Sequence, residues 1–191
     1  MKKSNEKIKN ILITGNPGVG KTTLIHRLIS KLNVPAGGFY TSEIRDENGR
    51  RQGFKIISLN GDEGVMASVD IISKNKVSKY GVDVETIDRI GVNAIKEAIE
   101  NNKIIVIDEI GRMELFSKRF QDITISALNS PSLVLGTISA KDNAFTEKIK
   151  ERQDTKIVTL TKQNFAEIET YLERLLLKSE PFSKKIDGSQ E

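Results

Sequence analysis

Two short stretches of the chain combine residue types and spacings that could do chemistry. The first is Gly15-Asn-Pro-Gly-Val-Gly-Lys-Thr22, in which three glycines lead into a lysine and a threonine. The second is the carboxylate pair Asp108-Glu109, which directly follows the apolar residues 104–107. Two adjacent carboxylates raise the cost of ionising each other unless a positive charge lies nearby. The pair is therefore either the solvated end of a strand or part of a site that faces a cation.

The glycine-rich stretch has the spacing G-x-x-x-x-G-K-[ST], which predicts a phosphate-binding loop. It follows an apolar run at residues 10–14 and opens a helix predicted over residues 21–32, which is the context that the pattern requires. Glycines allow successive backbone N–H groups to converge on an anion, and the helix N-terminus adds partial positive charge. Lys21 would reach the β- and γ-phosphates of a nucleotide, and the Thr22 hydroxyl would ligate Mg²⁺.

A bound nucleotide also accounts for the two acids. In an open α/β sheet, ligands gather at the carboxyl ends of the strands, so Asp108 and the glycine loop can meet over one triphosphate. We expect Asp108 to complete the Mg²⁺ site with Thr22, and Mg²⁺ and Lys21 to keep it ionised. Because side chains alternate along a strand, Glu109 leaves in another direction. Glu109 is then the candidate to orient or deprotonate an attacking water.

The predicted catalytic residues are Glu109, Lys21 and an arginine, because the transition state needs a further cation. Arg112 and Arg152 are the two alternatives for that arginine. Thr22 and Asp108 are the predicted metal ligands. The residues predicted to bind the nucleotide are Gly15, Asn16, Pro17, Gly18, Val19, Gly20, Lys21, Thr22, Thr23, Ile104, Ile105, Val106, Ile107, Asp108, Glu109, Ile110 and Gly111.

The elements that must position these residues alternate between strand and helix. Short apolar runs predict strands at residues 10–14, 104–107, 133–138 and 156–160, and helical spacing predicts helices at 21–32, 84–101, 114–128, 146–151 and 164–178. Asn48-Gly49 predicts a hairpin between strands at 38–45 and 52–59, followed by a third strand at 65–72. This order indicates one α/β domain with a mainly parallel central sheet and an antiparallel hairpin insertion.

Composition narrows the classes of protein that remain. The chain has 191 residues, a net charge of +4 and no cysteine, which excludes disulfides and thiolate zinc sites. Without a basic stripe interleaved with aromatics, nucleic-acid binding has no support. The apolar run near the N-terminus is too short for a signal peptide or a membrane span, so we expect a cytoplasmic protein without membrane contact. We expect one domain at residues 10–179, with flexible ends at 1–9 and 180–191.

With these pieces in place, the chain resembles the THEP-type, or cancer-related, nucleoside-triphosphatase family. The similarity covers about residues 11–177. It includes the glycine loop, Gly38-Phe-Tyr-Thr-Ser-Glu-Ile-Arg45, Lys79-Tyr-Gly-Val-Asp-Val84 and Ile107-Asp-Glu-Ile-Gly-Arg-Met-Glu-Leu115. The resemblance implies a P-loop, RecA-like three-layer fold and Mg²⁺-dependent hydrolysis of several nucleoside triphosphates (ATP, GTP, CTP and UTP) with loose base selectivity. It also implies the metal and water-activating roles of Asp108 and Glu109.

The chain departs from the family pattern at two places. Ser139 stands where the family often has proline, and of two arginines that the family often carries near positions 150 and 152 only Arg152 is present. Arg152 is therefore favoured over Arg112 as the charge-stabilising residue. Two other functions stay open: a nucleotide or small-molecule kinase, which needs a second pocket, and a nucleotide-switched module that binds a protein or RNA partner.

Overall fold

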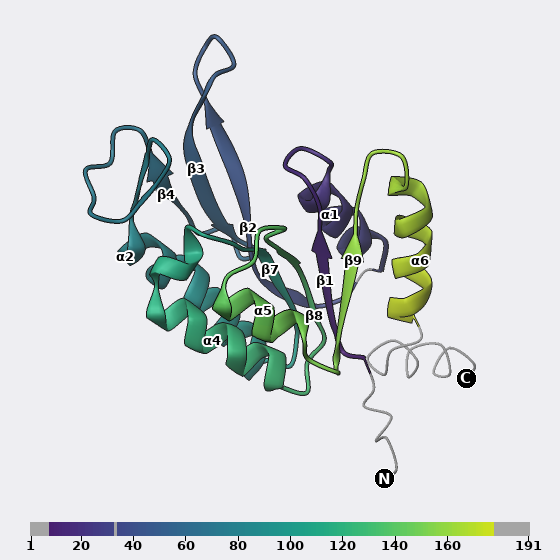
Figure 1. The fold of residues 1–191 in the computed structure, drawn as a ribbon. Helices are drawn as coiled ribbons and strands as arrows, with labels where there is room; N and C mark the ends of the chain where they lie inside the picture. The colour runs from purple at the N-terminus through teal and green to yellow at the C-terminus, as the bar shows by residue number, and fades with distance from the viewer. Residues whose placement is uncertain (1–7, 33, 178–191) are drawn as a thin grey trace.

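The computed structural model describes residues 8–32 and 34–177. Figure 1 shows its helices and strands along the chain. In order they are β1 (Asn10–Thr14), α1 (Lys21–Leu32), β2 (Ala36–Arg45), β3 (Arg51–Ser58), β4 (Glu63–Ser68), β5 (Lys76–Val77), β6 (Tyr80–Val82), α2 (Val84–Thr86), the π-helical η1 (Ile87–Val92), α3 (Asn93–Glu100), β7 (Ile104–Ile110), the 3₁₀ turn η2 (Glu114–Phe116), α4 (Lys118–Asn129), β8 (Val134–Ile138), α5 (Ala144–Lys150), β9 (Thr155–Thr159) and α6 (Phe165–Leu177).

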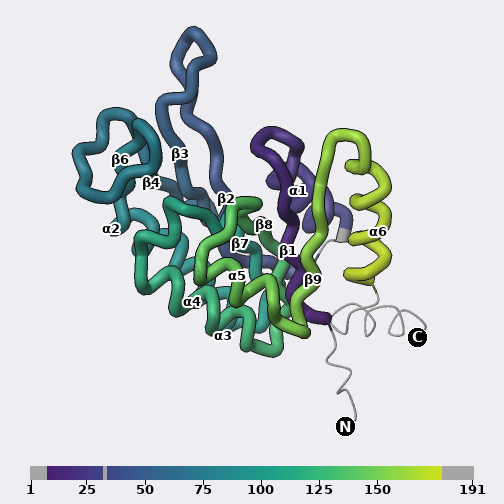
Figure 2. Tube along the Cα trace, viewed as in Figure 1, coloured from purple at the N-terminus to yellow at the C-terminus, as the bar shows by residue number. Residues whose placement is uncertain are grey.

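The strands of the described residues form one nine-stranded sheet in the order β5-β6-β4-β3-β2-β7-β8-β1-β9. The half from β2 to β9 is parallel, and the half from β2 to β5 is antiparallel. Figure 2 shows how the chain crosses from one half to the other. The carboxyl ends of β1, β7 and β8 therefore meet at one edge of the sheet, beside the antiparallel half.

Helices cover both faces of the parallel half (Figure 1). Helices α1 and α6 pack on one face, where Leu28 and Leu172 meet Val106, and α3, α4 and α5 pack on the other, where Phe120 and Ile149 join the cluster of Ile107. Side chains of β7 alternate between the two clusters, as a strand requires. The expected α/β fold, with a mainly parallel central sheet and an antiparallel hairpin insertion, is confirmed.

The hairpin predicted at Asn48-Gly49 is present. Asp46 Oδ1 accepts hydrogen bonds from the backbone N–H groups of Asn48 (3.0 Å) and Arg50 (2.8 Å), and Gly49 has a φ of +74°. The following strand begins earlier than predicted, at Glu63 instead of residue 65. The turn closes through a bond from Ser58 N to Asp62 O (2.8 Å), so pairing with β3 resumes directly after it.

The helix predicted over residues 114–128 is interrupted at Ser117. This residue has extended backbone (φ −84°, ψ 119°), and its Oγ accepts from the N–H of Phe120 (2.9 Å), so it caps a helix that begins at Lys118. Glu114 lies in the separate turn η2 before that cap. Strand β7 is longer than predicted and continues through Asp108 and Glu109, which are joined by a cis peptide bond.

In the described residues no helix has the length and apolar character to cross a membrane. The flexible ends expected at 1–9 and 180–191 lie outside the described residues, apart from Ile8 and Lys9. The backbone N–H of Lys9 donates to Asp154 O (3.2 Å), so Asp154 lies beside the start of β1.

Candidate active site

The glycine loop lies between the end of β1 and the start of α1. Gly18 (φ +76°) and Gly20 (φ +100°) have a left-handed backbone conformation, which residues other than glycine rarely adopt. The loop can therefore turn its amides inward. Lys21 Nζ donates to the loop carbonyls of Gly15 (3.0 Å) and Asn16 (3.4 Å). An ionised phosphate is a stronger acceptor for an ammonium group than a peptide carbonyl, so Lys21 can exchange these bonds for a ligand.

Asp108 is the point where the loop and the acidic pair meet. Thr22 Oγ1 donates to Asp108 Oδ2 (2.5 Å), and Thr137 Oγ1 on β8 donates to Asp108 Oδ1 (2.5 Å). Asp108 is only 2% exposed, and this burial raises its pKa, whereas the two hydroxyl donors and the charge of Lys21 oppose the rise. The proximity of Thr22 and Asp108, 86 residues apart in sequence, agrees with the sequence prediction.

Two further carboxyl groups lie beside Asp108. Burial raises the pKa of the partly buried Glu109, and the nearby charge of Lys21 opposes that rise. Glu114 is 5% exposed, and burial together with the charge of Glu109 raises its pKa to about 8. A Cβ on Gly111 would lie 2.9 Å from Glu114 Oε2 and 3.1 Å from Glu109 Oε1, so both oxygens border the same glycine. With a pKa of about 8, Glu114 is mostly protonated at neutral pH.

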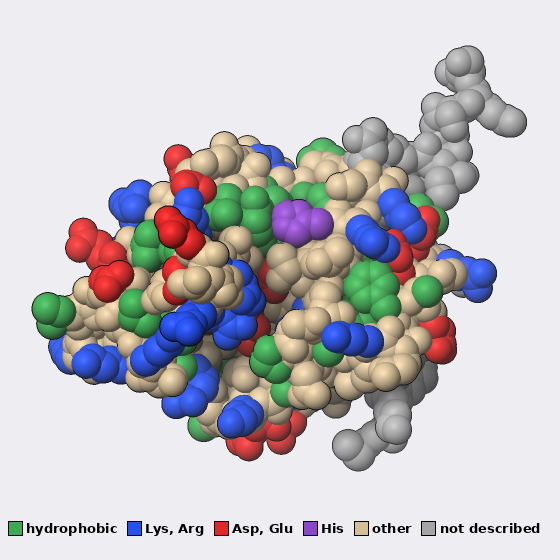
Figure 3. Space-filling view, turned by 90° about the horizontal axis from the view of Figure 1, so that it is seen from above, with side chains coloured by type: hydrophobic (Ala, Val, Ile, Leu, Met, Phe, Trp, Pro, Cys, Tyr) green, Lys and Arg blue, Asp and Glu red, His purple; other side chains and the backbone are tan. Residues whose placement is uncertain are grey.

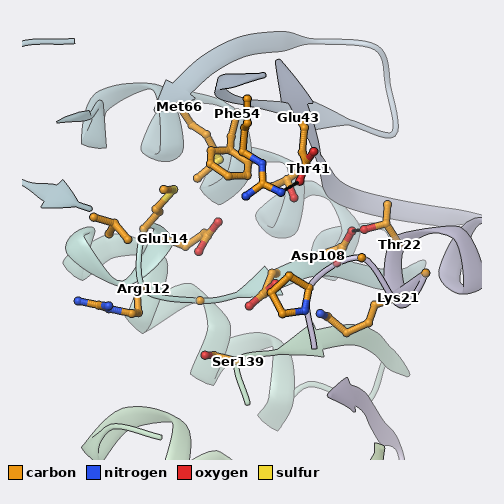
Figure 4. Close-up of a pocket in the computed structure, with 18 of the residues that line it drawn as sticks. Lys21, Thr22, Thr41, Glu43, Phe54, Met66, Asp108, Arg112, Glu114 and Ser139 are labelled. Carbon is orange, nitrogen blue, oxygen red and sulfur yellow. Dashed lines mark hydrogen bonds and ion pairs between the residues drawn. The ribbon is translucent and has the colours of Figure 1, made fainter. Parts of the chain in front are cut away.

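These groups line a cavity of about 590 Å³ that runs from the glycine loop past the acids to the antiparallel strands (Figure 4). Seen from above in Figure 3, this end of the molecule is hollowed, with Lys and Arg side chains gathered on one side. The lining residues are Pro17, Gly18, Gly20, Lys21, Thr22, Thr23, Thr41, Glu43, Arg51, Phe54, Met66, Val77, Asp108, Glu109, Gly111, Arg112, Met113, Glu114 and Ser139. The volume is within the range of small-molecule sites.

Part of the predicted nucleotide-binding set lies elsewhere. Ile104, Ile105, Val106 and Ile107 are 0–4% exposed in the sheet core, and none of them lines the cavity. The side chain of Ile110 is also buried, although its neighbours Glu109 and Gly111 line the cavity. Residues Gly15, Asn16 and Val19 belong to the loop but do not line the cavity.

The structure does not bring Arg152 to the cavity. Its Nε and Nη2 donate to the carboxyl group of Asp154 (2.9 and 2.8 Å), and Nη2 also donates to Leu128 O (3.2 Å). The carbonyl of Asp154 accepts from Asn10 N (3.1 Å) at the start of β1, whereas the glycine loop follows the end of β1. The structure gives the preference for Arg152 no support, because the chain after β8 returns through α5 to the opposite edge of the sheet.

Of the residues that sequence reasoning missed, three bear directly on the chemistry of the cavity and its surroundings: Thr137, Glu114 and Arg51. Thr137 was assigned only to a strand and Glu114 only to a helix, and Arg51 fell between the two predicted hairpin strands. The similarity of the stretch from Ile107 to Leu115 to one family was a signal for Glu114. Nothing local marked Thr137 or Arg51, whose positions follow from sheet pairing.

The side-chain oxygens of Thr22 and Asp108 suit Mg²⁺ as ligands. A threonine hydroxyl and a carboxylate converge there, and Mg²⁺ prefers such oxygen ligands, usually one or two from protein with the rest from phosphate and water. No group of three or more His, Cys, Asp or Glu side chains in the described chain could hold an ion by itself. The two side-chain oxygens therefore fit an ion that takes its other ligands from phosphate and water.

Comparison with known proteins agrees with this geometry. A sequence profile described as NTPase matches residues 10–172. The chain belongs to this NTPase family. Its relatives include the nucleoside-triphosphatase THEP1 of Thermotoga sp. (strain RQ2), which is 47% identical over 154 residues, covering 81% of this chain and 87% of that protein. The human cancer-related nucleoside-triphosphatase is 36% identical over 172 residues, covering 82% of this chain and 90% of that protein.

Solved structures of the NTPase family have the same fold. The crystal structure of THEP1 from Aquifex aeolicus aligns with a TM-score of 0.79 at 35% identity, covering 89% of this chain and 99% of that one. The solution structure of a human cancer-related nucleoside triphosphatase aligns with a TM-score of 0.77 at 34% identity, covering 90% and 98%. The resemblance inferred from sequence and the P-loop, RecA-like fold that it implied are both confirmed.

Proposed function

We propose that the chain hydrolyses nucleoside 5′-triphosphates to the diphosphate and phosphate, with Mg²⁺ as cofactor and with broad base specificity. The observation that carries this proposal is the direct bond between Thr22 and Asp108 inside the cavity that Glu109 also lines. A phosphate loop, a metal-binding oxygen pair and a carboxylate base are the parts that P-loop hydrolysis needs.

Binding is assigned to the glycine loop and the two residues that follow it. Backbone amides of the loop and Lys21 would hold the β- and γ-phosphates, and Thr22 and Asp108 would hold the ion. When bound, Mg²⁺ would neutralise charge that develops on the phosphate oxygens. Thr137 keeps the Asp108 carboxyl in place through its hydrogen bond to Oδ1, so the second oxygen stays directed at Thr22.

Glu109 is assigned the chemical step. It accepts a proton from the attacking water as the water oxygen bonds to the γ-phosphorus. The bond from that phosphorus to the bridging oxygen breaks, and the diphosphate leaves with the electron pair. Glu114 lies beside Glu109 as a neutral acid, so it adds no second negative charge next to the triphosphate at neutral pH. A positioned base of this kind contributes about 10²–10⁴-fold in rate.

The proposed hydrolysis has broad base specificity. It is supported by the resemblance and by the names of the relatives, which specify a nucleoside triphosphate and no base. The kinase and the switch module remain alternatives that the same assay separates. A kinase would release little phosphate until an acceptor is added, and a switch would turn over slowly until a partner is added. The expected cytoplasmic location remains a prediction.

The test is phosphate release from ATP, GTP, CTP and UTP, each with Mg²⁺ and with excess chelator. We expect hydrolysis of all four with Mg²⁺ and none with chelator. Metal-independent release would contradict the assigned metal site, and strong preference for one base would contradict the broad specificity.

A further inference from the structure

The cavity is lined by an arginine that has no role in the hydrolysis proposed above. Among the described residues that line the cavity, the positively charged ones are Lys21, Arg51 and Arg112. Lys21 belongs to the phosphate loop. Arg112 is exposed, and Figure 4 shows its side chain extending away from Lys21. Arg51 is therefore the cation that lines the cavity on the side of the antiparallel strands.

The guanidinium of Arg51 is held in place from two sides. Its Nη2 forms an ion pair with Glu43 Oε1, and its Cζ lies 5.3 Å from the centre of the Phe54 ring. Both partners also line the cavity. A planar guanidinium that is stacked on a ring and paired with a carboxylate loses little further freedom when it binds a ligand.

The hydrogen-bonding capacity of Arg51 is only partly used. A guanidinium has five N–H donors. In the structure its Nε is buried without a hydrogen-bond partner, and its carboxylate partner Glu43 also pairs with Arg45. One carboxylate, Glu43, thus faces two arginines and neutralises the charge of Arg51 only in part. Because Arg51 lines the cavity, an oxyanion there can accept from Nη donors that the Glu43 pair does not use.

The position of Arg51 complements that of Lys21. The glycine loop forms one wall of the cavity and strands β2 and β3 form another, and Figure 4 shows Asp108 between Lys21 on one side and Glu43 and Phe54 on the other. In phosphoryl transfer the nucleophile and the leaving group are in line on opposite sides of the phosphorus. Glu109 and Arg51 both line this cavity, so a phosphoryl group attacked by a water that Glu109 activates lies in the space that Arg51 also faces.

We propose that Arg51 is a catalytic residue that binds the γ-phosphoryl oxygens during transfer, from the side of the attacking water. The inference rests on the proposed hydrolysis and adds the charge-stabilising residue. Arg51 gains and loses no covalent bond, because the water proton goes to Glu109 and the electron pair of the broken bond goes to the diphosphate. The planar fork of arginine matches two phosphoryl oxygens, which the ammonium of lysine cannot do.

The test compares Arg51→Ala, Arg51→Lys and Arg45→Ala. Arg45 is the matched control, because it lies on the same hairpin and pairs with the same Glu43 but does not line the cavity. We expect Arg51→Ala to lower kcat by about 10²–10³-fold while the Kd of a fluorescent ATP analogue changes by less than about threefold. Arg51→Lys should recover only a small part of the rate, and Arg45→Ala should retain it.

Added guanidinium ion gives a readout that a purely structural role would not change. We expect millimolar guanidinium to restore part of the activity of Arg51→Ala and to leave Arg45→Ala unchanged. A kcat within about threefold of wild type in Arg51→Ala, or an equal loss in Arg45→Ala, would overturn the inference. If Arg51→Ala does not fold, near-wild-type kcat in a folded Arg51→Lys overturns it alone. Failure of the wild type to release phosphate would instead contradict the proposed function.

Discussion

At the scale of single residues, three carboxyl groups share one cavity but differ in their surroundings. Asp108 accepts bonds from Thr22 and Thr137, Glu109 lies near Lys21, and Glu114 is buried against Glu109. Groups whose surroundings separate their pKa values take different roles in catalysis. The first suits a metal, the second suits a base, and the third is a neutral acid at physiological pH.

Replacing Glu109 with glutamine tests the base directly. Glu109→Gln keeps the shape of the side chain but cannot take a proton, so we expect hydrolysis to fall by about 10²–10⁴-fold with nucleotide affinity retained. Single-turnover phosphate release and equilibrium binding of ATP measure the two quantities. Turnover close to wild type would show that another group activates the water.

Glu114 gives the folded state a pH dependence whose sign follows from the direction of its shift. Its pKa is raised from 4.5 to about 8, so between these values the folded protein holds a proton that the unfolded chain releases. The free energy of unfolding should therefore fall as pH rises through this window, by at most about 1.4 kcal/mol per pH unit. Glu114→Gln removes this contribution, because glutamine does not titrate.

Urea unfolding of the wild type and of Glu114→Gln at pH 5 and pH 8.5 measures the effect. We expect the stability of the wild type relative to the variant to decrease between the two values. The exposed Glu151 supplies a control, since Glu151→Gln should leave the pH profile of the wild type unchanged. Parallel profiles for wild type and Glu114→Gln would contradict a neutral Glu114.

The residues of the site divide by how far their signals extend along the sequence. Lys21 and Thr22 belong to a local pattern with a physical reason for each position, and Asp108 follows an apolar strand, so all three could be predicted. Thr137 acts across β7 and β8, where Ile107 pairs with Gly136. The contact of Thr137 with Asp108 joins residues 29 apart in the chain, so it leaves no local trace, and the same holds for Arg51.

At the scale of elements, short caps decide where the functional turn ends. Ser117 Oγ accepts from Phe120 N and also donates to Asp88 on η1, so it starts α4 and ties it to the neighbouring helix. This cap separates the turn η2, which carries Glu114, from α4. Periodicity alone merges the two, since apolar spacing continues across Ser117.

Ser117→Ala should lower the free energy of unfolding by about 1 kcal/mol, the usual contribution of an N-cap side chain. Ser126→Ala is the control within the same helix, because this serine is exposed and bonds only the preceding turn at Asp122 O (3.0 Å). Urea denaturation of both variants provides the measurement. An equal loss in the two would mean that the cap has no special contribution.

Element types were more predictable than element ends. Apolar strands without alternation indicate burial on both faces, and the Asn48-Gly49 turn marks the hairpin, so both appear where expected. Strands β5 and β6 have only two and three residues, too few to give a period. The π-helical η1 lies inside a predicted helix, and its residues keep an apolar face that does not distinguish the two helix types.

At the scale of the whole molecule, sheet order determines which parts can cooperate. Strand β8 lies between β1 and β7, so the glycine loop and the acidic pair are two strands apart at the same edge. The antiparallel half adds a further wall beyond β2, and Arg51 lies on this wall at the start of β3. Arg152 was favoured because the family often carries arginines near this position, but α5 carries it to the other edge of the sheet. Long-range placement of this kind needs the topology.

The central claim is that the glycine loop and the acidic pair bind one Mg²⁺–triphosphate between them. A crystal structure of Glu109→Gln soaked with ATP and Mg²⁺ tests it most directly, since slowed hydrolysis should preserve the substrate. We predict an ion bound to Thr22 Oγ1 near the Asp108 carboxyl, with the γ-phosphate facing residue 109. A nucleotide bound elsewhere, or a metal that contacts neither side chain, would contradict the account.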